Sequence, residues 1–153
     1  PCPPIPIGKG GLAMKWGALT MQITLGVLIL IGSLGVVSAN HSYVLTVHEL
    51  MGGMEKASSP AQKGFFLIDV RTPEEHFSGF IPNTDRNIDF REIQFRHQEI
   101  GAKLDDHIVV YCQSGQRSNI AAETLADLGY KHVYNVAGSM NAWQQAGYPV
   151  DFP

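Results

Sequence analysis

The sequence is short of cysteine and of charge, and each shortage excludes a class of protein. Among its 153 residues the only cysteines are Cys2 and Cys112, too few for the disulfide framework of a small secreted domain. Charged residues make up 16% of the chain and the formal net charge is -3, so nucleic-acid binding is not indicated. The six histidines are scattered without the spacing of metal ligands, and we therefore predict no metal site.

The N-terminal region has no charged residue from Trp16 to Ala39. One lysine precedes the apolar core of this stretch, and Val37-Ser38-Ala39 follows it with small residues at the minus-three and minus-one places. Residues 14–39 therefore have the pattern of a secretory signal peptide that is cleaved before Asn40. An uncleaved membrane anchor is the alternative, because the uncharged run is long enough to span a bilayer.

These features predict the domain organisation. Residues 1–13 are rich in Pro and Gly and precede Met14, so we exclude them from the fold as a non-native or wrongly assigned leader. Residues 40–153 are then one domain, exported and soluble in a bacterial periplasm, or held at the membrane if residues 14–39 stay attached. Cleavage leaves Cys112 as the only thiol, and a lone cysteine in an oxidising compartment indicates a reactive one.

After residue 40, short apolar runs alternate with segments of helical spacing. The runs rich in β-formers predict strands at Tyr43–Leu45, Phe65–Val70, Arg86–Ile88, Ile108–Tyr111 and His132–Val136. Capping signals and three- and four-residue apolar steps predict helices from Thr46 to about Lys56, from Thr72, over Phe90–Leu104, from near Ser118 to Gly129, and over Gly138–Ala146. This alternation predicts an α/β fold with a parallel sheet and helices on both faces.

Cys112 ends the most apolar of these strands, at the edge where open α/β sheets bind their ligands. The polar loop that follows opens a helix, whose N–H groups and dipole favour an anionic sulfur. Arg117 adds a fixed positive charge, and Gly115 allows a positive φ. A buried, inert cysteine is the alternative, but such a residue needs no loop of glycine and arginine after it.

The segment Cys-Gln-Ser-Gly-Gln-Arg-Ser, which begins at Cys112, resembles the active-site loop of rhodanese sulfurtransferases. Four residues separate Cys112 from Arg117, whereas phosphatases of the cysteine-arginine type usually have five. The resemblance extends to three further segments: Asp69-Val70-Arg71, Gly79-Phe80-Ile81-Pro82 and Gly138 to Trp143. The chain departs from the family where Phe80 replaces the usual His, where Ser139 replaces a second glycine, and by one extra residue between Pro82 and Asn87.

The resemblance implies a five-stranded parallel sheet and a single-domain sulfurtransferase, which we expect to be a monomer. The implied catalytic residues are Cys112 and Arg117, and the implied substrate-binding loop consists of Gln113, Ser114, Gly115, Gln116 and Ser118. Asp69 and Arg71 are predicted to be structural residues near the site, and we interpret Arg71 and Glu75 as a structural charged pair. No metal or organic cofactor is implied.

The predicted reaction moves a sulfane sulfur from thiosulfate or a similar donor to cyanide or a thiol, through a persulfide of Cys112. Two alternatives stay open. A phosphatase or arsenate reductase is disfavoured by the loop length and, for the reductase, by the missing second cysteine. A non-enzymatic persulfide carrier would use the same loop, so the sequence does not separate it from an enzyme.

Overall fold

The computed structural model describes residues 43–57 and 62–153. The predicted leader, its cleavage site before Asn40 and the predicted helix break at Ser58-Ser59-Pro60 lie outside these residues. Within the described ranges no helix combines the length and the apolar character needed to span a bilayer.

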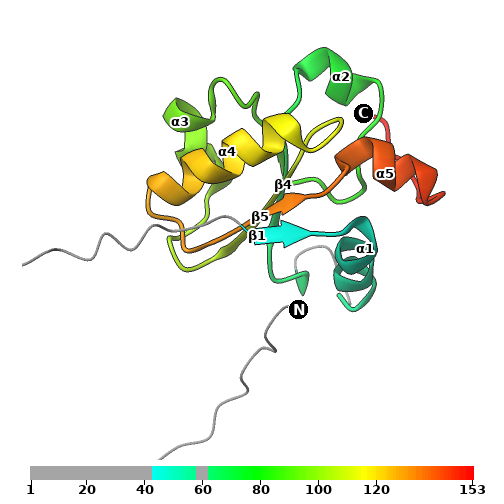
Figure 1. The fold of residues 1–153 in the computed structure, drawn as a ribbon, viewed down its shortest axis with the longest axis horizontal. Helices are drawn as coiled ribbons and strands as arrows, with labels where there is room; N and C mark the ends of the chain where they lie inside the picture. Colours follow the sequence, from blue (N-terminus) through cyan, green and yellow to red (C-terminus); the bar gives the residue numbers. More distant parts are fainter. Residues whose placement is uncertain (1–42, 58–61) are drawn as a thin grey trace, which may run out of the picture. The chain divides into compact units, whose positions relative to one another are not determined.

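Five parallel strands form one sheet in the order β1-β5-β4-β2-β3. The strands are β1 (Tyr43–Leu45), β2 (Phe66–Asp69), β3 (Arg86–Asn87), β4 (His107–Tyr111) and β5 (His132–Val136). The central strand, β4, has neighbours on both sides, and all the carboxyl ends lie along one edge of the sheet (Figure 1). The predicted parallel α/β sheet is therefore confirmed.

Helices cover both faces of this sheet, as predicted. They are α1 (Val47–Glu55), α2 (Pro73–Phe77), α3 (Ile93–Arg96) with the 3₁₀ turn η2 (His97–Ile100), α4 (Gln116–Asp127) and α5 (Ser139–Gln145). On one face Ile108 and Val110 of β4 lie in a core with residues of α3 and α4. On the other face Val109 and Tyr111 lie in a core with residues of α1 and α5. Each fully buried Ile or Val in these two layers stabilises the fold by about 1.5–3 kcal/mol.

Local hydrogen bonds explain where α1 and α2 begin. The Thr46 hydroxyl accepts from the backbone N–H of Glu49, whose carboxylate accepts from the Thr46 N–H. Thr72 and Glu75 repeat this capping box, and Pro73 occupies the first helical position of α2. Both helix starts lie where the sequence predicts them. A capping box involves only two residues that are three apart in the chain, so it can be recognised from the sequence alone.

The predicted helix over Phe90–Leu104 is wrong in extent. Only α3 and η2 form there, and Gly101 ends η2 in the left-handed conformation at φ 76°. Glu92 gives the helix no side-chain cap, and Phe95 is 82% exposed, so the apolar spacing does not bury a continuous stripe. A pattern that lacks both a cap and a buried face does not maintain a long helix.

Candidate active site

Cys112 lies directly after β4, at the carboxyl edge of the sheet, and none of its surface is exposed. The chain then turns into α4, which begins at Gln116, two residues before the predicted start. Gly115 is the N-cap of α4 and has φ 98°, the positive value predicted for it. A Cβ atom on Gly115 would lie 3.2 Å from the backbone nitrogen of Gly138, so only glycine fits this turn without displacing its neighbour.

The sulfur atom of Cys112 accepts hydrogen bonds from the loop that surrounds it. The Gly115 N–H donates to Sγ over 3.1 Å, and the Ser118 hydroxyl donates over 3.4 Å. Burial alone would raise the pKa of the Cys112 thiol, but these bonds and further backbone N–H groups at Ser114 and Ser118 outweigh it and lower the pKa. The site therefore favours the thiolate, which is the nucleophilic form of cysteine.

The first turn of α5 holds the backbone of Cys112 from the other side. The Ser139 hydroxyl accepts from the Cys112 N–H over 3.1 Å and donates to the Val136 carbonyl over 2.8 Å. Ser139 is fully buried and has φ 47°, in the left-handed region that favours glycine. Met140 and Asn141 donate their N–H groups to the carbonyls of Cys112 and Gln113. The hydrogen bond between the Cys112 N–H and Ser139 was not predicted from the sequence. The presence of Ser139 where the family has a second glycine was the one feature that pointed to it.

Arg117 points its guanidinium at Glu75 of α2. Two parallel hydrogen bonds of 2.7 Å join Nη1 to Oε2 and Nη2 to Oε1. The hydrogen bonds from Arg117 lower the pKa of Glu75 from 4.5 to about 2, against an opposing effect of burial, and raise the pKa of Arg117. The predicted pair of Arg71 with Glu75 is therefore wrong, because Arg117, 42 residues along the chain, takes the carboxylate.

Arg71 instead pairs with Asp69 at the end of β2, and both side chains are buried. Arg71 Nη2 lies 2.7 Å from Asp69 Oδ2 and also donates to the Gly79 carbonyl over 2.7 Å. Its Nη1 donates to the Gln113 side-chain oxygen over 3.4 Å, which joins this buried pair to the loop. Through this bond Asp69 and Arg71 are linked to the loop that follows Cys112.

The remaining predicted loop residues differ in their exposure and in their contacts. Ser114 and Gln116 are exposed, and the Gln113 amide donates to Asn141 of α5 over 2.6 Å. The Gly115 carbonyl accepts from the side chain of Asn135 in β5 over 3.2 Å. Asn135 was not among the predicted site residues. Its side chain fixes the carbonyl of Gly115, the residue whose N–H donates to the sulfur of Cys112.

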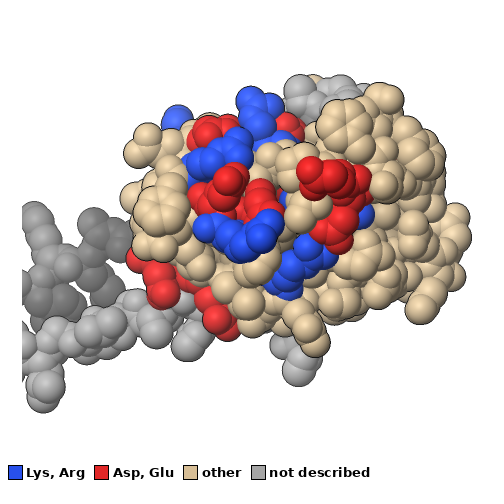
Figure 2. All heavy atoms as spheres, turned by 90° about the horizontal axis from the view of Figure 1, so that it is seen from above, with Lys and Arg blue, Asp and Glu red and all other residues tan. Residues whose placement is uncertain are grey.

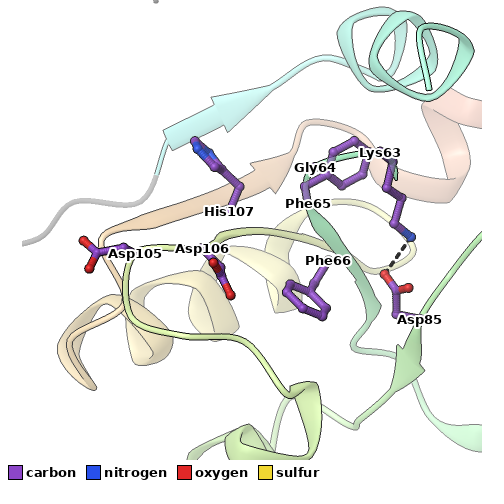
Figure 3. A pocket seen from close by; sticks show the side chains of 8 residues that line it. All are labelled: Lys63, Gly64, Phe65, Phe66, Asp85, Asp105, Asp106 and His107. Carbon is purple, nitrogen blue, oxygen red and sulfur yellow. Dashed lines mark ion pairs between the residues drawn. The ribbon is translucent and has the colours of Figure 1, made fainter. Parts of the chain in front are cut away.

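A pocket of about 370 Å³ lies at the opposite, amino end of the strands (Figure 3). It is lined by Lys63, Gly64, Phe65, Phe66, Asp85, Asp105, Asp106 and His107. Lys63 lies 2.6 Å from Asp85, which also accepts from the Leu67 N–H. The polar groups of the pocket are thus engaged with other groups of the protein, and no cysteine lines it. In the described ranges no set of three or more His, Cys, Asp or Glu side chains is arranged to hold a metal ion.

Comparison with known proteins agrees with this geometry. The model of the rhodanese-like domain matches residues 46–146. A sulfurtransferase of Allochromatium vinosum is 38% identical over 87 residues, which cover 57% of this chain and 78% of that protein. The thiosulfate sulfurtransferase PspE of Escherichia coli is 39% identical over 75 residues, 46% of this chain and 67% of that protein.

A solved structure supports the same relationship. The rhodanese-related protein from Thermoplasma volcanium superposes with a TM-score of 0.60 and 28% sequence identity, over 72% of this chain and 99% of that one. The loop at Cys112, the parallel sheet and the matched family model all agree. The chain belongs to the rhodanese-like domain family.

Proposed function

We propose that the chain is a sulfurtransferase that carries a sulfane sulfur on Cys112, from thiosulfate or a similar donor to cyanide or a thiol. The observation that supports this most directly is the pair of hydrogen bonds at the sulfur atom. Gly115 N–H and Ser118 O–H donate to Sγ at the N-terminal end of α4, where the helix dipole adds positive potential. The names of the related thiosulfate sulfurtransferases support the same donor class.

In the first step the Cys112 thiolate attacks the outer sulfur of the donor. A bond forms between Sγ and that sulfur, the bond to the sulfonyl sulfur breaks, and sulfite leaves with the electron pair. The lowered pKa of Cys112 favours the thiolate, the form that attacks, so the step does not call for a separate general base. Since Cys112 has no exposed surface in this conformation, the loop must shift for the donor to reach Sγ.

In the second step an acceptor removes the outer sulfur. Cyanide bonds to it, the sulfur–sulfur bond breaks, thiocyanate leaves and the Cys112 thiolate returns. A thiol acceptor follows the same course and leaves as a persulfide. Donor and acceptor react in separate half-reactions, so ping-pong kinetics are expected. Export of the domain and a monomeric state stay predictions.

Mass spectrometry of the intact protein tests the persulfide directly. Treatment with thiosulfate should add the mass of one sulfur atom, and cyanide should remove it. Cys112→Ser should gain nothing, and the same gain in this variant would overturn the assignment. Continuous production of thiocyanate separates an enzyme from a carrier, which would load once and then turn over no further.

A further inference from the structure

The two capping boxes of the chain differ in what else their glutamates bind. In α1 the Glu49 carboxylate accepts from the Thr46 N–H over 2.8 Å and from the Thr46 hydroxyl over 2.7 Å. Glu49 is exposed, and among the residues that the structure describes it forms no ion pair. In α2 the Glu75 carboxylate accepts from the Thr72 N–H over 3.1 Å, and the same oxygen, Oε2, accepts from Arg117 Nη1 over 2.7 Å. The second box therefore connects the start of α2 to the first turn of α4.

This connection fixes the orientation of the Arg117 guanidinium. Two parallel hydrogen bonds of 2.7 Å join it to Glu75, and the side chains of Arg117 and Glu75 are only 29% and 34% exposed. Figure 2 looks down on the side of the molecule where α2 lies in Figure 1, and it shows acidic and basic side chains lying next to one another on one part of this face. A long arginine side chain has many rotamers in water, so a carboxylate that accepts two of its hydrogen bonds selects one orientation.

Arg117 also acts on the sulfur. The hydrogen bonds to Glu75 are the largest cause of the raised pKa of Arg117, and after the opposing effect of burial the charge of Cys112 and a hydrogen bond to its side chain raise this pKa further. The next residue, Ser118, donates its hydroxyl to Sγ over 3.4 Å, so two consecutive residues of α4 interact with the same atom. The Arg117 guanidinium thus interacts both with a carboxylate of α2 and with the candidate nucleophile.

We infer that Glu75 is a positioning residue, which holds the Arg117 guanidinium beside the sulfur of Cys112 and so makes the capping box of α2 part of the active site. The inference rests on the proposed sulfur transfer and adds to it a residue that acts through Arg117. The Glu75 carboxylate is negative, so its charge alone disfavours the thiolate of Cys112, whereas a guanidinium held near the sulfur favours it. A positioning role and a simple charge effect of Glu75 therefore act on the thiolate in opposite directions.

The pH dependence of Cys112 alkylation separates these two effects. Iodoacetamide is neutral and reacts with the thiolate, so its rate at Cys112 rises with pH around the pKa of the thiol. Mass spectrometry of the peptide that contains Cys112 follows this rate. In Glu75→Gln the released guanidinium moves away from the sulfur, and the midpoint of the pH profile should rise by about half a pH unit. Loss of the Glu75 charge without any change in Arg117 would instead lower the midpoint.

A double-mutant cycle with Arg117→Met tests whether Glu75 acts through Arg117. Methionine keeps an unbranched side chain but has no charge and no hydrogen-bond donor. The measured quantity is the rate of persulfide formation on Cys112 with thiosulfate in a single turnover. Glu75→Gln should lower this rate about fivefold in the otherwise wild-type protein, and by no more than about twofold in the Arg117→Met background. An equal loss in both backgrounds would show that Glu75 acts independently of Arg117, and would overturn the inference.

Glu49→Gln is the matched control. It removes the same charge from the same position of a capping box, but the box of α1 holds no residue of the loop that follows Cys112. Urea unfolding shows whether both variants fold. The alkylation midpoint and the rate of persulfide formation in Glu49→Gln should match those of the wild-type protein. Equal changes in Glu49→Gln and Glu75→Gln would assign the effect to the loss of a helix cap, and would overturn the inference.

The outcomes are distinct. A raised midpoint and a non-additive loss of rate in Glu75→Gln support the inference, and a lowered or unchanged midpoint overturns it. If Glu75→Gln does not fold, Glu75→Asp takes its place, because it keeps the charge but shortens the side chain that reaches Arg117. Its midpoint should rise as well, and an unchanged midpoint overturns the inference. No sulfur gain on Cys112 from thiosulfate in the wild-type protein would overturn the proposed function, whereas the alkylation midpoints would still decide the role of Glu75.

Discussion

The two ends of the sheet differ in how their polar groups are used. At the amino end Lys63 and Asp85 line a pocket, but both bond to the backbone of the protein: Lys63 donates to the Asn83 carbonyl, and Asp85 accepts from the Leu67 N–H of β2. At the carboxyl end Gly115 and Ser118 turn their donors inward, onto a single buried sulfur atom. Hydrogen-bond donors thus converge on one side-chain atom at the carboxyl end, whereas the polar groups at the amino end bond to separate partners.

The largest expected difference between the ends comes from their ion pairs. Arg117→Lys keeps the charge but loses the planar guanidinium that forms two hydrogen bonds to Glu75. The value of kcat/KM should fall about tenfold, which corresponds to a loss of about 1.4 kcal/mol of transition-state stabilisation. Lys63→Met removes the pair with Asp85 at the amino end. It should lower the free energy of unfolding by about 1–3 kcal/mol, with kcat/KM changed by less than about twofold.

Steady-state assays and urea unfolding of both variants check this contrast. An active Arg117→Lys with unchanged kcat/KM would remove any role of this ion pair in the reaction. A large loss of kcat/KM in a folded Lys63→Met would show that the two ends are coupled.

The second comparison uses two residues with a positive φ: Ser139 at the carboxyl end of the sheet and Gly101 at the amino end. Ser139→Ala leaves the buried Cys112 N–H without its acceptor, at about 1–3 kcal/mol, and keeps the strained backbone. Ser139→Gly loses the same bond but relieves the strain, so it should be about 1 kcal/mol more stable than Ser139→Ala. Gly101→Ala adds strain only, since no atom lies within 4 Å of the new Cβ, and should cost about 1 kcal/mol.

Urea unfolding curves for the three variants give these differences. A Ser139→Ala variant as stable as the wild type would show that the Ser139 hydroxyl contributes nothing to the site.

The smallest effects concern pH. The folded state lowers the pKa of Glu75 from 4.5 to about 2, so the stability that this group adds is complete above about pH 4.5 and is lost as the pH falls toward 2. At the amino end, burial and the charge of His132 lower the pKa of His107 below 6.5, with Asp106 opposing. Its contribution is complete above about pH 6.5 and is lost as the pH falls below that value.

Unfolding midpoints measured from neutral pH to about pH 2 resolve the two groups. Glu75→Gln should flatten only the acid part of the curve, and His107→Gln only the part just below pH 6.5. A Glu75→Gln curve that keeps the acid slope of the wild type would assign that slope to other carboxylates.

Sequence patterns predicted the parts of the fold that depend on near neighbours. The strands Tyr43–Leu45 and His132–Val136 were predicted with their observed limits. A short run of β-forming residues ends where the residue types change, so its limits can be recognised in the sequence. The helix starts after Thr46 and Thr72 followed from capping boxes. The helix over Phe90–Leu104 was predicted from apolar spacing alone, and there the absence of a cap decided the outcome.

The sequence predicted the loop after Cys112, but not the residues from other elements that contact this loop. Gly115 and the sulfur-binding turn follow from consecutive residues. Glu75 and Arg117 are 42 residues apart, and Ser139 meets Cys112 across 27 residues. Such contacts depend on how strands β2, β4 and β5 are ordered in the sheet, which a local pattern does not encode. The sequence therefore suggested Glu75 as the partner of Arg71, whereas Arg71 forms its ion pair with Asp69.

The position of β5 between β1 and β4 decides when the sheet beside Cys112 can be completed in a growing chain. Tyr43 pairs with Tyr134, which is 134 minus 43, or 91, residues later. Synthesis runs from the N-terminus, so β1 has no neighbour in the sheet until β5 has been made, and Ser139 follows later still. Sheets closed by such distant contacts complete their folding late. The Cys112 N–H therefore gains its acceptor, the Ser139 hydroxyl, only after nearly the whole domain has been synthesised.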